Sequence, residues 1–260
     1  MELSIISVNY NTSTLMLPLL ISMTKAIQGK AYEIIVIDNG STDNSCQLIR
    51  KKFPDLCLIE NAENKGFARA VNQGVKRAKG NYLLILNPDV RLLPGSLEKT
   101  INYLDGHFEV GLLLPKLLNP NGSLQLSCRT WYNLSIILFR RTPLGKFFPN
   151  HRIIRQHLMM DWNHEEVREV DWGLGACMFL RREALKGRNL FDERFFLYFE
   201  DVDLCWRMKN EGWKVVYYPK AVMVHSHLRQ SAGDGFNRMK WEHFKSLIKF
   251  YLKHRRLNPL

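Results

Sequence analysis

The sequence has few cysteines, and they are scattered. Five occur in 260 residues, and none belongs to a CxxC pair. Disulfide scaffolds and structural zinc sites use paired, closely spaced cysteines, so we expect neither here. An odd number of isolated thiols is typical of a reducing compartment. The pattern therefore predicts a cytoplasmic protein.

Long apolar segments are also missing. The best candidate, LMLPLLISMTKAI at 15–27, is shorter than the roughly 20 apolar residues that a membrane-spanning helix needs. The N-terminal MELSIISVNYN has no basic stretch of the kind that opens a secretory signal. We therefore expect a buried helix at 15–27 and no export signal.

Two glycine-rich phosphate-binding motifs are absent. No GxGxxG follows the first apolar run, and GxxxxGK[ST] does not occur. A dinucleotide-binding Rossmann site and a P-loop are therefore not supported. Repeats and low-complexity linkers are absent too, so a single continuous domain over 1–260 is expected.

Acidic residues are missing from one long segment. Residues 110–160 contain none, against seven Lys or Arg, and 236–256 contain seven Lys or Arg against Glu242 alone. These two segments account for the net charge of +12. Such surfaces suit nucleic acid, acidic lipid headgroups or phosphorylated substrates. A generic solvated basic surface is the plainer interpretation.

The first half alternates between apolar runs and amphipathic segments. Strands are expected at 3–10, 32–39, 56–61, 81–89 and 110–117, with helices between them. Apolar strands that alternate with helices predict an α/β fold with a parallel sheet covered on both faces. Such sheets bind ligands at the carboxyl ends of their strands.

The second half is less regular. Residues 130–161 are aromatic and basic and give no clear assignment, whereas 172–185 looks like a strand entering a helix. A helix is expected at 199–212, and β-rich runs at 214–227. The segment 236–256 predicts an amphipathic helix whose single apolar face carries Trp241, Phe244, Leu247, Ile248, Tyr251 and Leu252.

Polar residues follow three of the predicted strands directly, in VNYN, IDNGSTD and LNPDV. Parallel strands bring their carboxyl ends to one edge, so these groups predict a nucleotide pocket. There Asp38 or Asn39 would hydrogen-bond a base or ribose, and Asp89 would hold a divalent metal. Taken singly, each group is also explained by an Asx-type turn or a helix cap.

Three carboxylates crowd the start of the predicted helix at 199–212, namely Glu200, Asp201 and Asp203. Acidic residues in a first turn interact favourably with the helix dipole, which alone explains such a cluster. Asp203 and Arg207 are four residues apart, so we expect them to form a structural pair.

The ordered set SVNYN, VIDNGSTDNS, ENKGFARAVNQG, LLILNPDV, WGLGACMFLRREAL, FFLYFEDVDLCWRMKNEGW and VMVHSH resembles family 2 glycosyltransferases. It most resembles their bacterial rhamnosyltransferase and galactofuranosyltransferase-like branch. The resemblance covers roughly 2–227. It implies a GT-A fold with a mostly parallel central sheet flanked by helices, a nucleotide-sugar donor, a divalent metal (Mg²⁺ or Mn²⁺) and inversion at the anomeric carbon. It divides the chain into a nucleotide-sugar-binding half (1–115), an acceptor half (116–235) and a C-terminal basic helix (236–256).

The resemblance also implies a donor site. The expected nucleoside contacts are Tyr10, Asn11, Asp38, Asn39 and, in the stretch that closes over the base, Lys65, Gly66 and Asn72. Asn87-Pro88-Asp89 would occupy the DxD position. Because Asn87 replaces the first carboxylate, Asp89 would be the only acidic metal ligand of that motif, and His225 would complete the metal site.

On the acceptor side, the resemblance implies that Asp201 is the base and that Glu200 flanks the acceptor or tunes the base. Gly175 and Ala176 would let the backbone approach the acceptor sugar. Trp172 would stack on that sugar, or else pack tightly in a strand. A closing segment is expected at 226–235, with Arg229 near the diphosphate.

The leading hypothesis is an inverting, metal-dependent glycosyltransferase. It would move rhamnose or a similar sugar from a dTDP- or UDP-sugar to a saccharide or lipid-linked acceptor in cell-surface polysaccharide synthesis. The C-terminal helix would contact the inner face of the plasma membrane, pack on its own domain, or do both. The alternative is a non-catalytic nucleotide- or nucleic-acid-binding protein, because basic and aromatic residues interleave at 129–148. The leading hypothesis includes no nucleic-acid partner.

Overall fold

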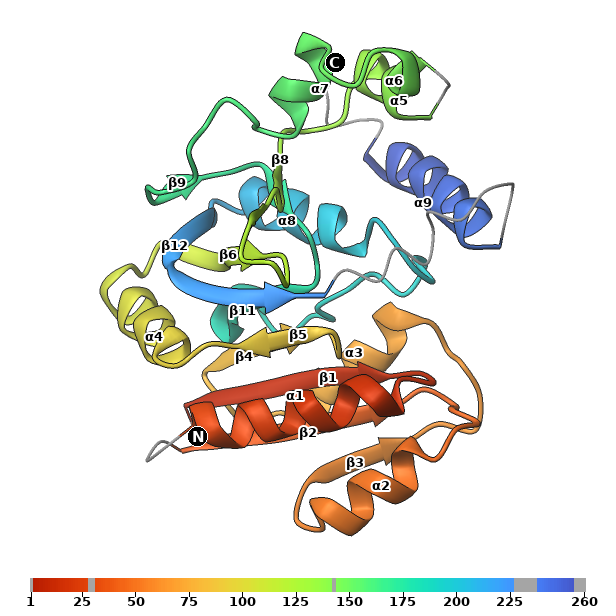
Figure 1. The fold of residues 1–260 in the computed structure, drawn as a ribbon, viewed down its shortest axis with the longest axis vertical. Helices are drawn as coiled ribbons and strands as arrows, with labels where there is room; N and C mark the ends of the chain where they lie inside the picture. The colour runs from red at the N-terminus through yellow and green to blue at the C-terminus, as the bar shows by residue number, and fades with distance from the viewer. Residues whose placement is uncertain (1, 28–30, 142–143, 227–237, 255–260) are drawn as a thin grey trace.

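The computed structural model describes residues 2–27, 31–141, 144–226 and 238–254. Their main sheet has ten strands, in the order β3-β2-β1-β4-β11-β6-β12-β5, with β7 beside β6 and β9 beside β12 (Figure 1). A two-stranded sheet pairs β10 with β8. The strands are β1 (Leu3–Asn9), β2 (Tyr32–Asp38), β3 (Cys57–Glu60), β4 (Tyr82–Leu86), β5 (Val90–Leu92), β6 (Val110–Leu118), β7 (Leu124–Gln125), β8 (Cys128–Arg129), β9 (Arg168–Glu169), β10 (Trp172–Gly173), β11 (Cys177–Arg181) and β12 (Lys214–His225).

The helices follow the predicted alternation in the first half and fill the unassigned region of the second. They are α1 (Ser13–Ala26), α2 (Ser45–Lys52), α3 (Phe67–Arg77), α4 (Ser96–Gly106), α5 (Leu134–Arg141), α6 (Leu144–Phe147), α7 (Arg152–His157), the 3₁₀ turn η1 (Arg182–Leu185), α8 (Glu200–Asn210) and α9 (Arg238–His254). Within the described residues, no helix is both long and apolar enough to cross a bilayer.

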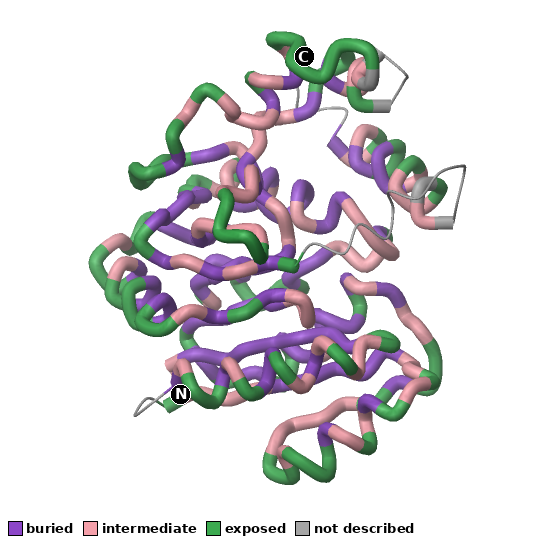
Figure 2. Tube along the Cα trace, viewed as in Figure 1, coloured by how far each residue is buried: buried purple, intermediate pink, exposed green. Residues whose placement is uncertain are grey.

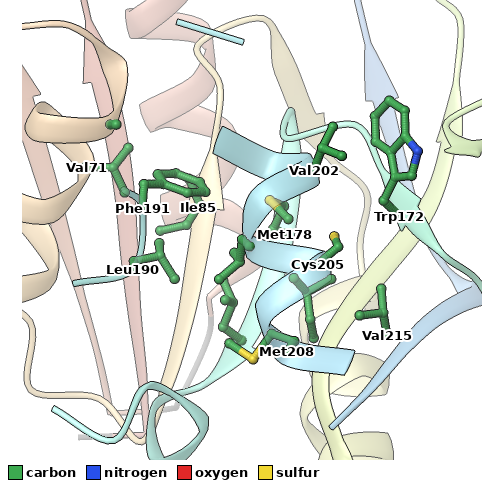
Figure 3. Packing of buried hydrophobic residues seen from close by; sticks show 14 of the residues in the cluster. Val71, Ile85, Trp172, Met178, Leu190, Phe191, Val202, Cys205, Met208 and Val215 are labelled. Carbon is green, nitrogen blue, oxygen red and sulfur yellow. The ribbon is translucent and has the colours of Figure 1, made fainter. Parts of the chain in front are cut away.

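Two apolar cores lie on opposite faces of the sheet. Successive side chains of a strand point to opposite faces, so Ile5 joins the core under α1, α2 and α4, while Ile6 joins the core under α3, α8 and α9. The central strands are accordingly buried along most of their length (Figure 2). Figure 3 shows the second core, where Val202, Cys205 and Met208 of α8 lie among residues of the sheet and of the 190–191 segment.

The predicted parallel sheet is confirmed for β1 to β4, because β1 pairs in parallel with both β2 and β4. The 172–185 segment differs from its prediction as one strand entering a helix. It divides into β10, which joins the small sheet, and β11, which runs antiparallel between β4 and β6. Only the short turn η1 follows. Strand β11, from the second half of the chain, is thus inserted between two strands from the first half, β4 and β6.

The short strand β5 was not predicted. It begins directly after Asp89 and pairs antiparallel with the end of β12, which sets Val90 opposite His225. Three residues give too little periodicity to recognise a strand from sequence. The pairing brings Asp89 beside His225, although they are separated by more than half of the chain.

Only part of the apolar face predicted for the C-terminal helix enters the core. In α9, Leu247 and Phe250 are buried against the core, and Tyr251 packs beside them. The other large apolar side chains point away from the protein and are exposed, namely Trp241, Phe244, Ile248 and Leu252. Helical periodicity alone placed both groups together because the two faces adjoin around the helix axis.

One buried carboxylate joins α8 to α9. The Asp203 side chain is fully buried and accepts hydrogen bonds from Arg207 Nε (2.9 Å), Lys253 Nζ (2.6 Å) and His254 Nε2 (2.8 Å). Burial alone would raise the pKa of Asp203. The hydrogen bond from His254 and the charges of Arg207 and Lys253 outweigh that effect and hold the pKa below its ordinary value. The predicted Asp203–Arg207 pair is therefore confirmed, within a larger cluster.

Replacing Asp203 with Asn should destabilise the fold by about 3 kcal/mol, because Lys253 and Arg207 would keep their charges without the carboxylate that compensates them. Urea unfolding followed by circular dichroism measures this free energy. The exposed Asp55→Asn substitution is the matched control and should change it by less than about 0.5 kcal/mol. Equal stability of both variants would contradict the bridging role of Asp203.

Candidate active site

The predicted polar edge is present where β1 and β2 end. Asn9 and Asp38 lie opposite each other in the parallel register, and Asn9 Nδ2 donates to Asp38 Oδ1 at 2.5 Å. The other Asp38 oxygen accepts a hydrogen bond from the Ser41 backbone N–H at 2.9 Å. Both carboxylate oxygens are therefore oriented by the protein. The sequence analysis did not single out Asn9, although a buried amide at the end of an apolar strand was a usable signal.

Asn39 organises the loop that leads to α3. Its Oδ1 accepts hydrogen bonds from the Lys65 backbone N–H (3.1 Å) and Asn61 Nδ2 (3.2 Å), while its Nδ2 donates to Asn64 Oδ1 (3.0 Å). Gly66 has φ of +86°, and a Cβ there would lie 2.7 Å from the Phe196 ring, so this position requires glycine. The contact joins the donor-side loop to the segment that precedes α8.

Tyr10 and Asn11 lie at the rim of this edge. Tyr10 is 47% exposed, which leaves its ring available to a ligand. Asn11 has a positive φ of 53°, and its Oδ1 accepts a hydrogen bond from the Thr42 backbone N–H at 2.8 Å. That bond fixes the loop between β1 and α1 against the loop after β2.

Asn72 was expected to contact the nucleoside, but its side chain lies inside the protein. Its side chain is buried on α3, where Nδ2 donates to the Phe191 carbonyl (2.8 Å) and Oδ1 accepts from the Phe191 backbone N–H (3.0 Å). The amide thus supports the segment before α8. In this structure its hydrogen bonds go to protein groups.

Asp89 and His225, the two expected metal ligands, lie next to each other. His225 Nε2 lies 3.3 Å from Asp89 Oδ2. On the other side of the ring, Nδ1 donates to Gln125 Oε1 at 2.6 Å, and Gln125 Nε2 in turn donates to Asn119. Because Nδ1 is engaged by Gln125, Nε2 is the ring nitrogen that faces Asp89, and an imidazole nitrogen beside a carboxylate is a donor set that fits Mg²⁺ or Mn²⁺. Gln125 was not anticipated from the sequence.

The protein supplies only part of a metal shell. No group of three or more His, Cys, Asp or Glu side chains with metal-binding geometry occurs in the described part of the chain. An octahedral ion at Asp89 and His225 would therefore take its remaining ligands from water and from a bound diphosphate.

Two consecutive residues tie the metal motif to the predicted base. The Ala176 carbonyl accepts a hydrogen bond from the Asn87 backbone N–H at 2.9 Å, and the Gly175 N–H donates to Asp201 Oδ2 at 3.0 Å. A Cβ at Gly175 would lie 3.3 Å from the Asp201 Cβ, so a larger residue would crowd the carboxylate. The Asn87–Asp89 motif, the Gly175–Ala176 segment and Asp201 therefore lie next to one another.

Glu200 and Asp201 lack the cations that surround Asp203. Burial raises the pKa of Glu200 well above its ordinary value, and the charges of Asp201 and Asp203 raise it further. Among the described residues, Glu200 Oε2 is buried without a hydrogen-bond partner. Burial also raises the pKa of Asp201, opposed by hydrogen bonds from the Val202 and Gly175 N–H groups and by the charge of Arg129.

Arg129 is a further residue of this site that the sequence analysis did not select. It lies on β8, where it pairs with Trp172 of β10, and its charge acts on Asp201. Burial, together with the charge of Arg140, lowers the pKa of Arg129 to about 10. A cation near the carboxylate lowers the cost of ionising it.

Trp172 is packed in the core and does not face the site. Its indole is buried, Nε1 donates to the Thr130 carbonyl at 3.0 Å, and its ring stacks with Tyr132. The ring has no open face for a sugar here, so tight packing, the other interpretation of this residue, describes it.

The expected closing segment at 226–235 lies almost wholly outside the described residues, as do His227 and Arg229. Of that segment, only Ser226 is described. Its N–H donates to the Asp89 carbonyl at 2.9 Å, which joins the end of β12 to the metal motif.

Comparison with known sequences identifies relatives of one enzymatic type. The chain is 28% identical to the N-acetylglucosaminyl-diphospho-decaprenol L-rhamnosyltransferase of Mycobacterium tuberculosis, over 97% of this chain and 85% of that protein. It is 27% identical to the rhamnosyltransferase WbbL of Escherichia coli, over 87% of this chain and 84% of that protein.

Solved structures share the fold. The Staphylococcus aureus TarS fragment 1–349 in complex with UDP-GlcNAc matches all of this chain and 68% of that one, with a TM-score of 0.68 and 17% identity. The mannosyltransferase PcManGT of Pyrobaculum calidifontis, in complex with GDP-Man and Mn²⁺, matches 99% of this chain and 65% of that one (TM-score 0.64, 18% identity). The predicted GT-A fold is therefore confirmed.

The family model of glycosyl transferase family 2 matches residues 4–160, which is more than half of the sequence. The expected enzyme class is thereby confirmed, and the alternative of a non-catalytic binding protein is not supported. The chain belongs to glycosyl transferase family 2.

Proposed function

We propose that this glycosyltransferase is an inverting, metal-dependent enzyme. In this proposal it transfers rhamnose or a similar sugar from a dTDP- or UDP-sugar to a saccharide or lipid-linked acceptor in cell-surface polysaccharide synthesis. The observation that carries the proposal is the pair of hydrogen bonds at Gly175 and Ala176, which holds Asp201 next to the Asn87–Asp89 motif. Direct displacement with inversion requires a base for the acceptor hydroxyl on the side of the sugar opposite the departing diphosphate, and a carboxylate held close to the donor motif supports this role for Asp201.

The donor side of the proposal rests on the polar edge of the sheet. Tyr10 would lie beside the nucleobase, and Asp38 and Asn39 would contact the nucleobase and the ribose. Asn9 and the 61–66 loop fix the orientation of Asp38 and Asn39. The rhamnosyltransferase relatives support a deoxyhexose donor. The Mycobacterium tuberculosis relative, whose name contains a diphospho-decaprenol, supports a lipid-linked acceptor.

Asp89 and His225 would hold the metal in this proposal. When bound there, a divalent ion neutralises charge on the departing nucleoside diphosphate. Asp201 would accept the proton of the acceptor hydroxyl, and Gly175 would keep its carboxylate oriented. Glu200, with its raised pKa, would tune the base or contact the acceptor.

A nucleic-acid-binding role has little structural support. In the basic 129–148 segment, Tyr132 is buried and Trp131 packs edge-on against Trp206, so these two rings are not available for base stacking. Phe147 and Phe148 are exposed, but they lie at one end of the segment only.

Replacing Asp89 with Ala should abolish metal-dependent binding of dTDP and UDP, because the change removes the only carboxylate in the proposed metal site. Calorimetry with and without Mn²⁺ measures this. The exposed Asp55→Ala substitution is the control and should bind like the wild type. If the wild type binds neither nucleotide under either condition, the donor site is overturned. Whichever of dTDP and UDP binds more tightly would narrow the identity of the donor nucleotide-sugar.

Replacing Asp201 with Asn should lower kcat about 10²- to 10⁴-fold and leave nucleotide binding unchanged, because the amide cannot accept the hydroxyl proton. In the wild type, activity should fall as pH falls through the raised pKa of Asp201, since the protonated carboxyl is not a base. Transfer assays across pH, with calorimetry as the binding control, measure both effects. Retained turnover in the Asn variant would assign the base elsewhere.

Replacing Glu200 with Gln should raise the thermal stability at neutral pH. The folded-state pKa of Glu200 is raised, so ionisation of this group destabilises the fold at every pH above its unfolded pKa. The gain should vanish below that pKa, where both states are protonated. The acid limb of activity should stay in place, because Glu200 is not among the groups that raise the pKa of Asp201. Melting curves at pH 7 and pH 4 test the first effect. A lower Tm of the Gln variant at pH 7 would contradict this prediction, because it would show that the folded protein stabilises the ionised Glu200.

A further inference from the structure

The C-terminal helix α9 carries two adjoining apolar faces, an inner one that packs into the core and an outer one that is exposed. The inner face packs Leu247 and Phe250 into the core. Ser246 Oγ donates to the Leu197 carbonyl at 2.9 Å, and His243 stacks on Tyr198. These contacts, with the Asp203 cluster, anchor the helix. The outer face is not needed for that purpose.

The outer face is a continuous stripe. Trp241, Phe244, Ile248 and Leu252 recur at intervals of three or four residues, which places them on one side of a helix. Their side chains are between 43% and 65% exposed. The stripe extends over three helical turns, about 16 Å. Single exposed apolar residues are common on protein surfaces and need no explanation. A contiguous row of large ones indicates a docking surface.

The described charges beside the stripe sum to a net positive charge. Lys245 and Lys249 lie on one flank, and Glu242 is paired with Lys245 at 3.0 Å. The unbalanced charge is therefore that of Lys249, which is exposed and also donates to the Arg194 carbonyl at 2.6 Å. Lys253 is not part of this charge, because it is bound to Asp192 and Asp203 inside the protein. A second copy of this basic surface would be repelled, whereas an anionic lipid surface would be attracted.

A separate exposed apolar pair lies on α5, where Leu134 and Leu138 are one turn apart. Tyr251 Oη donates to the Tyr132 carbonyl at 3.4 Å, so the inner side of α9 lies near the residues that lead into α5. Figure 1 shows α5, α6, α8 and α9 in the upper half of the view, with α5 and α6 farthest from the central sheet. The first turn of α8 carries Asp201.

We propose that the outer stripe of α9 docks this protein on a membrane containing anionic lipids. The helix would lie in the plane of the interface, with its apolar stripe among the acyl chains and its lysines at the headgroups. This inference builds on the proposed function, because docking at this end would present the base to an acceptor carried by a lipid.

The test is cosedimentation of the full chain with vesicles of phosphatidylcholine and phosphatidylglycerol (7:3), which contain no acceptor. Phe244→Gln with Ile248→Gln should weaken binding at least about tenfold, because two apolar side chains leave the interface. The matched control is Ile21→Gln with Phe108→Gln. Ile21 is 42% exposed and Ile248 is 43% exposed, and both control residues lie away from α9. This control should bind like the wild type.

Electrostatic attraction predicts two further results. Binding should weaken in high salt and on vesicles of phosphatidylcholine alone. Lys245→Gln with Lys249→Gln should weaken it about fivefold or more. Circular dichroism of every variant checks that the fold is intact, which we expect because the substituted side chains are exposed.

Each remaining outcome counts against the proposal. It is overturned if the wild type does not sediment with the anionic vesicles, or if the stripe variant and its control bind equally. It is also overturned if sedimentation velocity shows a dimer that the stripe variant abolishes, since the stripe would then bind a second copy. Nucleotide calorimetry on the same protein separates the two proposals. A chain that binds nucleotide but not vesicles refutes docking alone, and the reverse refutes only the donor site.

Discussion

The placement of the catalytic end depends on how three neighbouring carboxylates are buried at the start of α8. Asp203 is compensated by Arg207, Lys253 and His254, so its burial fixes α8 against α9. Glu200 and Asp201 are close in sequence but have raised pKa values. A charge that is compensated by its neighbours holds a structure together. A charge that is not compensated is available as a base, and this segment contains both kinds.

The second constraint is the position of β11. Because β11 runs antiparallel between β4 and β6, the residues just before it meet the end of β4. That is why Ala176 contacts Asn87 while Gly175 contacts Asp201. The peptide groups of Gly175 and Ala176 therefore position both Asp201, the proposed base, and Asn87 of the proposed donor side, and a shift of this segment would move both together.

The anchoring of α9 gives the helix a second possible role. Its inner face and the Asp203 cluster secure it to the protein, so the outer stripe contributes little to folding. Because α9 contacts the segment that leads into α8, a surface docked on the stripe would lie at the catalytic end. The same helix would then connect the catalytic carboxylates to the surroundings of the acceptor.

The sequence by itself determined the α/β alternation of the first half, the polar residues at the strand ends and the family, because these depend on local periodicity and ordered motifs. It did not determine β5, the insertion of β11, or the contacts of Asp203 with Lys253 and His254. Those depend on pairings between residues far apart in the chain, which no local pattern records. The two faces of α9 were likewise decided by what packs against it. An apolar residue follows the same helical period whether it enters the core or faces outward.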